Sequence, residues 1–358
     1  MMHRYFPHTD EDIRSMLEVC KVKSLDDLYA DVPEELLLKE PYNLPEELCE
    51  KDVRDFFNNL AADNVPDLIC FAGAGYYDHY APAAINSLIS RSEFLTSYTP
   101  YQPEISQGTL QYIFEYQTMI CRLTGMEISN ASMYDGATAT AEAMILASAN
   151  NRKRHRILYT AALNPEVEAV IKTYARYHGV PLTKLPEVDG VTSIEALEEA
   201  LAEGDVAGVI LATPNYHGIL EDLTGVADLI HDKGALLIIN CVAGDLATIK
   251  SPGEWGADIA VGDAQSLGVP LNFGGPYLGF MAAKKSLMRK LPGRIVGATT
   301  DDLGNRVFVL TLQAREQHIR REKATSNICS NQGLMALYVT IYMSLLGDKG
   351  LDEVTRAG

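Results

Sequence analysis

The arrangement of apolar and polar residues changes near residue 66. Before that point, short amphipathic stretches with acidic surfaces predict helices, and no stretch has the pattern of a strand. Thr9 is placed to cap the first helix. Three prolines separate the helical stretches, at Pro33, Pro41 and Pro45. We therefore predict that residues 1–65 form a helical N-terminal arm rather than an independent domain.

From residue 66 onward, apolar β-prone runs alternate with helical patterns. The expected strands cover 67–73, 131–136, 156–161, 208–215, 235–244 and 257–263. The expected helices cover 81–90, 138–150, 164–179 and 222–234. Near-continuous apolar strands separated by helices are typical of a mainly parallel sheet with helices on both faces. We predict a large α/β domain over residues 66–300.

The last part of the chain predicts one more strand at 306–312 and an apolar helix at 332–346. We expect residues 301–358 to start a small C-terminal domain that is incomplete in this chain. A partner, or a C-terminal piece that is absent, would complete it.

Composition narrows the classes of partner. The chain has 358 residues and a net charge of -18, which argues against nucleic acids and anionic membranes. Six scattered cysteines without metal-like spacing indicate reduced thiols, and we expect no metal site. No signal peptide and no membrane-spanning apolar run are recognisable. We therefore expect a cytoplasmic protein.

Open parallel sheets bind ligands where their strands end, so the turns after the strands are candidate sites. Gly136, Ala137 and Thr138 join a strand to a helix and resemble a phosphate cradle built on a helix N-terminus. The alternative is that Asp135 or Thr138 acts only as a helix cap, and the sequence alone favours the cap. After the run 208–212, Asn215 and His217 could contact a ligand, or they could belong to an ordinary Pro-Asn turn.

A polar loop with two tyrosines lies at residues 96–108, directly before an expected helix that begins near Gln107. Its candidate binding residues are Ser97, Tyr98, Tyr101 and Gln102, and Pro100 and Pro103 restrict its backbone. The alternative is a well-packed surface loop, and we favour binding.

Several motifs in order resemble the P-protein family of the glycine cleavage system, which decarboxylates glycine. They are MHRYFPHT, SYTPYQPEISQG, MYDGATATAEA, GGPYLGF, LPGRIVGAT and REKATSNICSNQ, and they span essentially the whole chain. The likeness is greatest to the N-terminal-half subunit of the split bacterial form. It implies the fold type I of pyridoxal-phosphate-dependent transferases, with the cofactor lysine on the other subunit.

The resemblance also identifies what this chain lacks. No lysine occurs from Ser251 to Ala283, and Gln265 stands about where the cofactor lysine belongs. Val242 falls near the place of the acid that meets the pyridine nitrogen, and Asp245 is the nearest carboxylate. An amide cannot form a Schiff base, so we expect no catalytic residue within this chain and no covalently held cofactor.

The family implies several partners. Pyridoxal 5'-phosphate would be held by a lysine-bearing subunit 2, and the two subunits would form an α2β2 assembly. The assembly would act on glycine and pass the aminomethyl group to the lipoyl group of H-protein. A basic cluster comprises Arg315, Arg320, Arg321 and Lys323. It could dock H-protein, or it could form a solvated face or interface salt bridges, which the sequence alone favours. The alternatives are a purely structural or regulatory partner subunit and an autonomous fold type I enzyme.

Overall fold

A computed structural model describes residues 5–65, 68–69, 71–73 and 75–358 of the chain. The protein forms two compact units, Met1–Cys70 and Phe71–Gly358. The small C-terminal domain that we expect to begin at residue 301 stays a prediction.

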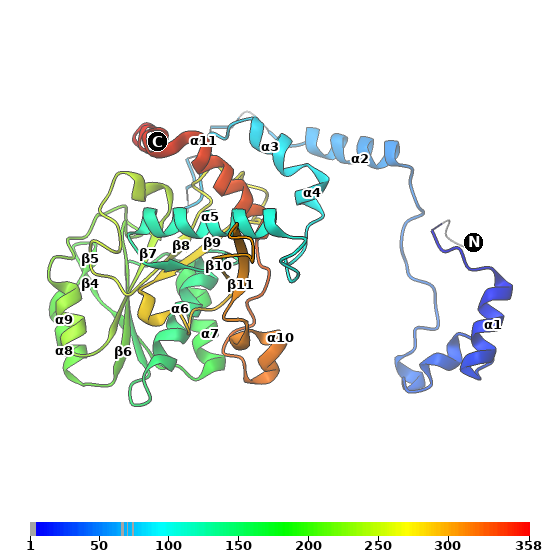
Figure 1. The fold of residues 1–358 in the computed structure, drawn as a ribbon, viewed down its shortest axis with the longest axis horizontal. Helices are drawn as coiled ribbons and strands as arrows, with labels where there is room; N and C mark the ends of the chain where they lie inside the picture. Colours follow the sequence, from blue (N-terminus) through cyan, green and yellow to red (C-terminus); the bar gives the residue numbers. More distant parts are fainter. Residues whose placement is uncertain (1–4, 66–67, 70, 74) are drawn as a thin grey trace. The chain divides into compact units, whose positions relative to one another are not determined.

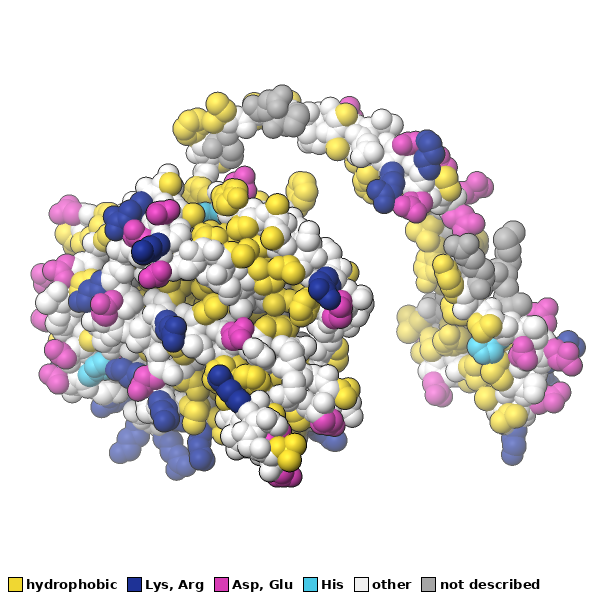
Figure 2. Space-filling view, turned by 45° about the horizontal axis from the view of Figure 1, so that its top comes forward, with side chains coloured by type: hydrophobic (Ala, Val, Ile, Leu, Met, Phe, Trp, Pro, Cys, Tyr) yellow, Lys and Arg dark blue, Asp and Glu magenta, His cyan; other side chains and the backbone are white. Residues whose placement is uncertain are grey.

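The first unit consists of short helices without a core of their own. Its elements are α1 (Asp10–Cys20), η1 (Asp26–Tyr29), η2 (Glu34–Leu36) and α2 (Glu50–Ala62). The Thr9 cap is confirmed, because its hydroxyl accepts a hydrogen bond from the Asp12 amide at 3.2 Å. None of the described residues of this unit is buried, and apolar side chains lie at its surface beside acidic ones (Figure 2).

The second unit is built on a seven-stranded sheet (Figure 1). In spatial order its strands are β1 (Ile128–Ser129), β9 (Gly279–Ala283), β8 (Ile259–Asp263), β7 (Leu236–Val242), β6 (Val206–Ala212), β2 (Arg156–Thr160) and β3 (Leu182–Leu185). The five strands from β8 to β3 run parallel, and β9 is antiparallel to both of its neighbours. Two small hairpins stand apart from this sheet, β4–β5 (Glu187–Val188 and Val191–Thr192) and β10–β11 (Ile295–Thr300 and Arg306–Thr311).

Helices cover both faces of the sheet, because the side chains of each central strand point alternately to two cores. Val209 and Leu211 of β6 join one core, and Ile210 joins the other. The first core includes α5 (Gln107–Thr124), α8 (Ile194–Ala202), α9 (Val226–Asp232) and α11 (Gly333–Ala357). The second includes α6 (Gly136–Asn150) and α7 (Pro165–His178). This arrangement confirms the predicted α/β architecture.

Shorter elements complete the second unit. They are α3 (Ala84–Ile89), α4 (Ser92–Leu95), η3 (Gly244–Ala247), η4 (Lys285–Leu287), η5 (Gln313–Arg315), α10 (Gln317–Arg320) and η6 (Arg321–Lys323). The strand expected at 67–73 is not formed at positions 68–69 and 71–73, and residues 67 and 70 lie outside the described residues. The run 131–136 makes an isolated bridge, Met133 to Gly279, in place of the expected strand. Among the described helices, none combines the length and apolarity needed to cross a bilayer.

Candidate functional site

The first amides of α6 lie at the carboxyl edge of the sheet and are bonded to two carboxylates. The Thr138 amide donates to Asp135 Oδ1 at 2.7 Å, which makes Asp135 the cap of the helix. The Gly136 amide donates to Asp263 Oδ2 at 3.0 Å. A Cβ at position 136 would stand 2.7 Å from the Asp263 backbone nitrogen, so glycine is needed for this approach. The amides of Gly136 and Thr138 are therefore not free for a phosphate group.

Asp263, the last residue of β8, connects the start of α6 to the turn that follows the strand. Its Oδ1 accepts a hydrogen bond from the Gln265 amide at 2.8 Å. The carboxylate also bonds with Tyr76, whose ring stacks on Tyr277 at a centroid distance of 4.8 Å. Burial raises the pKa of Asp263 to about 7, although the hydrogen bonds from the Gln265 and Gly136 amides act in the opposite direction.

Gln265 is buried, and its side-chain amide is fully engaged as a donor. Its Nε2 donates to the Tyr77 carbonyl at 2.8 Å and to the Val269 carbonyl at 2.7 Å. The side chain therefore holds two backbone segments together, and it carries no nucleophilic amine.

The nearest lysines in sequence lie elsewhere. Lys284 follows β9, whose Ala283 pairs with Ile259 at the start of β8, whereas Gln265 follows the end of β8. Lys284 Nζ donates to Asp258 Oδ1 at 2.7 Å. Lys250 Nζ lies 3.5 Å from the centroid of the Trp255 ring. Lys284 thus lies at the opposite end of β8 from Gln265.

The end of β7 carries no carboxylate. Val242 is its last residue and pairs in register with Asp263. Asp245 lies beyond it in η3, where burial raises the pKa of its carboxyl group. Enzymes of this fold hold pyridoxal phosphate with a lysine, a ring-nitrogen acid and free amides for the phosphate. The family resemblance implies that Gln265 takes the place of the lysine and Val242 that of the acid, which stays a prediction. With an amide, a valine and helix amides already bonded to carboxylates, these residues do not fit the cofactor.

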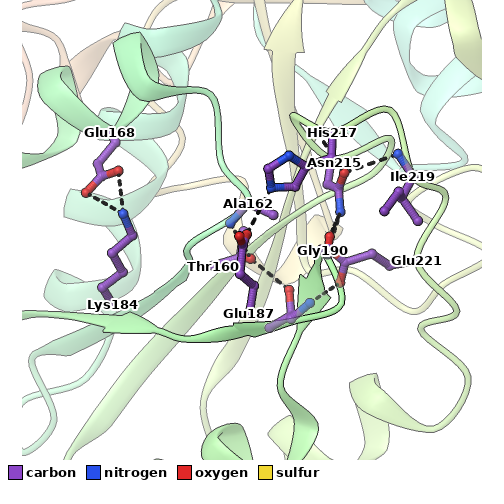
Figure 3. A network of polar contacts seen from close by, with 11 residues as sticks. Thr160, Ala162, Glu168, Lys184, Glu187, Gly190, Asn215, His217, Ile219 and Glu221 are labelled. Atoms are coloured by element: carbon purple, nitrogen blue, oxygen red, sulfur yellow. Dashed lines mark hydrogen bonds and ion pairs between the residues drawn. The ribbon is translucent and has the colours of Figure 1, made fainter.

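Asn215 uses its whole side-chain amide inside the protein, as Figure 3 shows. Its Nδ2 donates to the Gly190 carbonyl and to Glu221 Oε1, each at 2.8 Å. Its Oδ1 accepts from the amides of His217 and Ile219 at 3.0 and 3.1 Å. These bonds tie the loop after β6 to the turn of the β4–β5 hairpin rather than to the start of α6.

His217 and its neighbours extend the same network (Figure 3). His217 Nε2 lies 3.0 Å from Glu187 Oε2 on β4, at the surface. Nearby, the Lys184 ammonium donates to both oxygens of Glu168, at 3.2 and 2.9 Å. The contacts of Asn215 and His217 are those of a structural turn, which was one of the two alternatives the sequence left open.

The loop with the two tyrosines is held in place on one side and exposed on the other. Ser97 Oγ donates to the Phe94 carbonyl at 2.8 Å, and the Thr99 hydroxyl bonds to that of Ser330. Tyr98 is 75% exposed and makes no side-chain hydrogen bond within the described residues. Gln102 is exposed as well. A cavity of about 240 Å³ lies between this loop and residues 329–334.

Sequence reasoning gave no role to Arg294, which the structure places under this loop. Its Nη2 donates to Tyr101 Oη at 2.8 Å, and its Nε lies 3.6 Å from Glu316 Oε2. Arg294 is 2% exposed and Glu316 is 5% exposed. Arg294 also lowers the pKa of the Cys329 thiol against the opposing effect of desolvation. A charged residue just before the apolar run IVGA was the signal that could have drawn attention to it.

The predicted basic cluster lies on α10 and η6. Arg320, Arg321 and Lys323 are exposed and make no ion pair within the described part of the chain. Arg315 ends η5, and its side chain lies outside the described residues. No three His, Cys, Asp or Glu side chains of the described residues are grouped so that they could hold a metal ion.

Comparison with known proteins gives one consistent answer. Residues 3–357 match the family model described as glycine cleavage system P-protein. The chain is 51% identical over 357 residues to a protein of Brevibacillus brevis named "probable glycine dehydrogenase (decarboxylating) subunit 1", and this match covers 99% of the chain and 79% of the relative. A protein of Carboxydothermus hydrogenoformans with the same name is also 51% identical, over 98% of the chain and 79% of the relative.

Solved structures agree with the sequence relatives. The crystal structure of an inhibitor-bound glycine decarboxylase (P-protein) of the glycine cleavage system matches with a TM-score of 0.88 and 48% identity, over 98% of this chain and 79% of that one. A sphingosine-1-phosphate lyase of Burkholderia pseudomallei matches with a TM-score of 0.62 and 13% identity, over 89% and 73% of the two chains. The second likeness concerns the fold alone, which is fold type I of the pyridoxal-phosphate-dependent enzymes. The chain belongs to the glycine cleavage system P-protein family.

Proposed function

We propose that this chain is the subunit of glycine decarboxylase that lacks the cofactor lysine. A second, lysine-bearing subunit holds pyridoxal phosphate, and the two together decarboxylate glycine. The observation that carries the proposal is Gln265, which lies where the family resemblance implies the lysine and whose side-chain amide donates to two backbone carbonyls. The relatives' shared name, subunit 1, supports the existence of a second subunit.

The contribution of this chain to the reaction is the loop Ser97–Gln102, which enters the active site of the partner subunit. Glycine has almost no side-chain surface that an enzyme can contact. Its carboxylate must therefore be oriented by a few well-placed hydrogen-bond donors. Tyr98 is exposed and makes no hydrogen bond to other described residues, which supports a role as such a donor. Gly136, Ala137 and Thr138 form the first turn of α6, which Asp135 caps, and we infer that they are the remnant of a phosphate cradle.

The reaction also needs an acceptor for the aminomethyl group. That acceptor is the lipoyl group of H-protein, which docks on the basic surface of Arg320, Arg321 and Lys323. The exposure of these side chains and their lack of ion pairs with other described residues support docking by an acidic partner. The assembly contains two copies of each subunit and works in the cytoplasm.

Labelling with borohydride tests the proposal, because reduction fixes a Schiff base as a stable pyridoxyl-lysine. The purified chain is incubated with pyridoxal phosphate, reduced and mapped by peptide mass spectrometry, alone and together with the second subunit. We expect no stoichiometric label on this chain in either sample, one label on the partner, and glycine turnover only in the mixture. A single fully labelled lysine in this chain would contradict the proposal and favour an autonomous enzyme.

A purely structural partner subunit is the remaining alternative. It would lose assembly when the loop is altered, whereas a contributor to the site would lose turnover while assembly stays intact.

A further inference from the structure

Arg294 joins the interior of the second unit to the loop Ser97–Gln102. Its guanidinium is buried, and Nη2 donates to Tyr101 Oη at 2.8 Å. The guanidinium carbon also lies 5.1 Å from the centroid of the Tyr101 ring. Nη1 reaches Ser330 Oγ at 3.4 Å, and both Nη1 and Nη2 lie 3.4 Å from Cys329 Sγ. The arginine therefore contacts the loop and residues 329–330 at the same time.

The direction of the Arg294–Tyr101 hydrogen bond follows from chemistry. A guanidinium has donors and no acceptor, so the phenol oxygen of Tyr101 must accept this bond. The O–H of Tyr101 is then left to donate to some other group. No acceptor for it lies within hydrogen-bonding distance among the described residues, and Tyr101 is 43% exposed.

The surroundings fix Arg294 and Tyr101 in this arrangement. Glu316, itself buried, supplies the counter-charge at 3.6 Å from Arg294 Nε. The His318 ring packs against the Tyr101 ring at a centroid distance of 5.7 Å and an angle of 68°. The hydroxyls of Thr99 and Ser330 bond to one another across the base of the loop. With these contacts the phenol has little freedom to turn its oxygen toward a different donor.

We propose that Arg294 is a positioning residue, which holds the Tyr101 phenol as an acceptor on its inner side so that the O–H is presented outward to the carboxylate of glycine in the partner's active site. This inference rests on the proposed function, because it requires the loop to enter that site. Arg294 affects the substrate only through Tyr101 and does not itself contact the substrate.

A double-mutant cycle in the reconstituted two-subunit enzyme tests the inference. The variants are Tyr101→Phe, Arg294→Lys and the two combined, with kcat and KM measured for glycine and KM for lipoylated H-protein. Loss of one hydrogen bond made in the transition state lowers kcat/KM for glycine by roughly tenfold to a hundredfold. We expect kcat/KM for glycine to be lowered by this factor in both single variants. In the double variant kcat/KM for glycine should lie within about twofold of its value in Tyr101→Phe. KM for H-protein should stay unchanged.

Two controls keep a folding defect separate from a positioning defect. Arg306→Lys makes the same change at an exposed arginine that lies over the rings of Phe114 and Phe308, and it should leave glycine kinetics unchanged. Assembly is followed by size-exclusion chromatography. If Arg294→Lys does not fold, Ser330→Ala takes its place in the cycle, since it removes contacts with both Arg294 and Thr99 without changing charge.

The results of these measurements distinguish a failure of the positioning role of Arg294 from a failure of the proposed function. If Tyr101→Phe lowers kcat/KM and the effects of the two changes multiply, Arg294 acts independently of Tyr101 and the positioning role is wrong. If Tyr101→Phe leaves glycine kinetics within twofold, Tyr101 is not a substrate donor and the positioning role of Arg294 is wrong. The loop's proposed role is wrong as well only if Tyr98→Phe also leaves glycine kinetics within twofold.

Discussion

At the scale of single residues, Asp263 has two opposing effects on the folded chain. It accepts hydrogen bonds from the amides of Gly136 and Gln265, which anchor the start of α6 to the end of β8. Its desolvation raises its pKa from 3.8 to about 7. Between roughly pH 4 and pH 7 the folded chain therefore keeps a proton that the unfolded chain has released. The stability cost of Asp263 grows as the pH rises and is complete above pH 7.

Asp263→Asn should weaken this dependence on pH, because an amide does not titrate. We expect the Tm of the unmodified chain to fall more than that of the variant between pH 5 and pH 8. In terms of the free energy of unfolding, the two proteins should differ in their pH dependence by about 1–3 kcal/mol. Each unit of pKa shift corresponds to about 1.4 kcal/mol, and contact of the carboxylate with solvent offsets part of that energy. The measurement is thermal unfolding followed by circular dichroism. Asp222→Asn, at an exposed carboxylate whose pKa is lowered by its bonds to Thr224, serves as the control. Parallel curves for the unmodified chain and Asp263→Asn would contradict the assignment.

At the scale of elements, the β4–β5 hairpin depends on one side chain from the loop after β6. Asn215 bonds to the hairpin turn through Gly190 and to Glu221, which in turn accepts from the Thr192 amide of β5 at 3.1 Å. The Gly190 carbonyl and Glu221 Oε1 would each lose this donor if Asn215 were lost, whereas the Thr192 amide would keep its bond to Glu221 Oε2. The loop and the hairpin therefore form one structural unit.

Asn215→Ala should lower the free energy of unfolding by about 1–3 kcal/mol, because it leaves buried polar groups unpaired. Urea unfolding of the purified chain measures this change. His217→Ala provides the comparison, since its exposed pair with Glu187 should contribute less than about 1 kcal/mol. Glycine turnover of the assembled enzyme should be the same for both variants. A large loss of turnover in a folded and assembled Asn215→Ala enzyme would restore a ligand-binding role for this turn.

The sequence predicted the elements whose pattern is local and missed those that depend on contacts from elsewhere. The strands β6, β7 and β8 are continuous apolar runs, and their assignment is confirmed. The run 131–136 resembles a strand, but it is needed to deliver Asp135 to the cap of α6 and makes only a bridge. Gln265 is assigned to the lysine position by the family resemblance, from its distance along the chain to Val269 and Pro270, and this assignment stays a prediction. Arg294 could not be given a role, because its partners Tyr101 and Glu316 lie 193 residues before and 22 residues after it.

At the scale of the whole molecule, the two units differ in how they use apolar residues. The second has buried cores on both faces of its sheet. The first carries large apolar side chains that are exposed, among them Leu36 at 73% and Phe57 at 60%. Exposed apolar surface on this scale is typical of segments that bind another protein.

Deletion of residues 1–65 should separate folding from assembly. The remaining unit keeps its own cores, so we expect its Tm to change by no more than a few degrees. We expect its association with the lysine-bearing subunit to weaken by at least tenfold, because the apolar side chains of the arm would no longer be buried in the complex. Calorimetry of the truncated chain and titration of the two subunits measure the two effects. Unchanged association would show that the arm is not needed for assembly.

The two carboxylates at the start of α6 have a consequence for how the chain depends on its environment. In a protein whose fold is completed by a bound small molecule, stability follows the concentration of that molecule by mass action. Asp135 and Asp263 satisfy the helix N-terminus from within the same polypeptide, so their effective concentration is set by covalent connection and cannot be diluted. The amides of Gly136 and Thr138 therefore have their partners as soon as the chain has folded. If the cofactor is held by the other subunit, as proposed, we expect the stability of this scaffold not to follow the supply of vitamin B6, on which its family's chemistry depends.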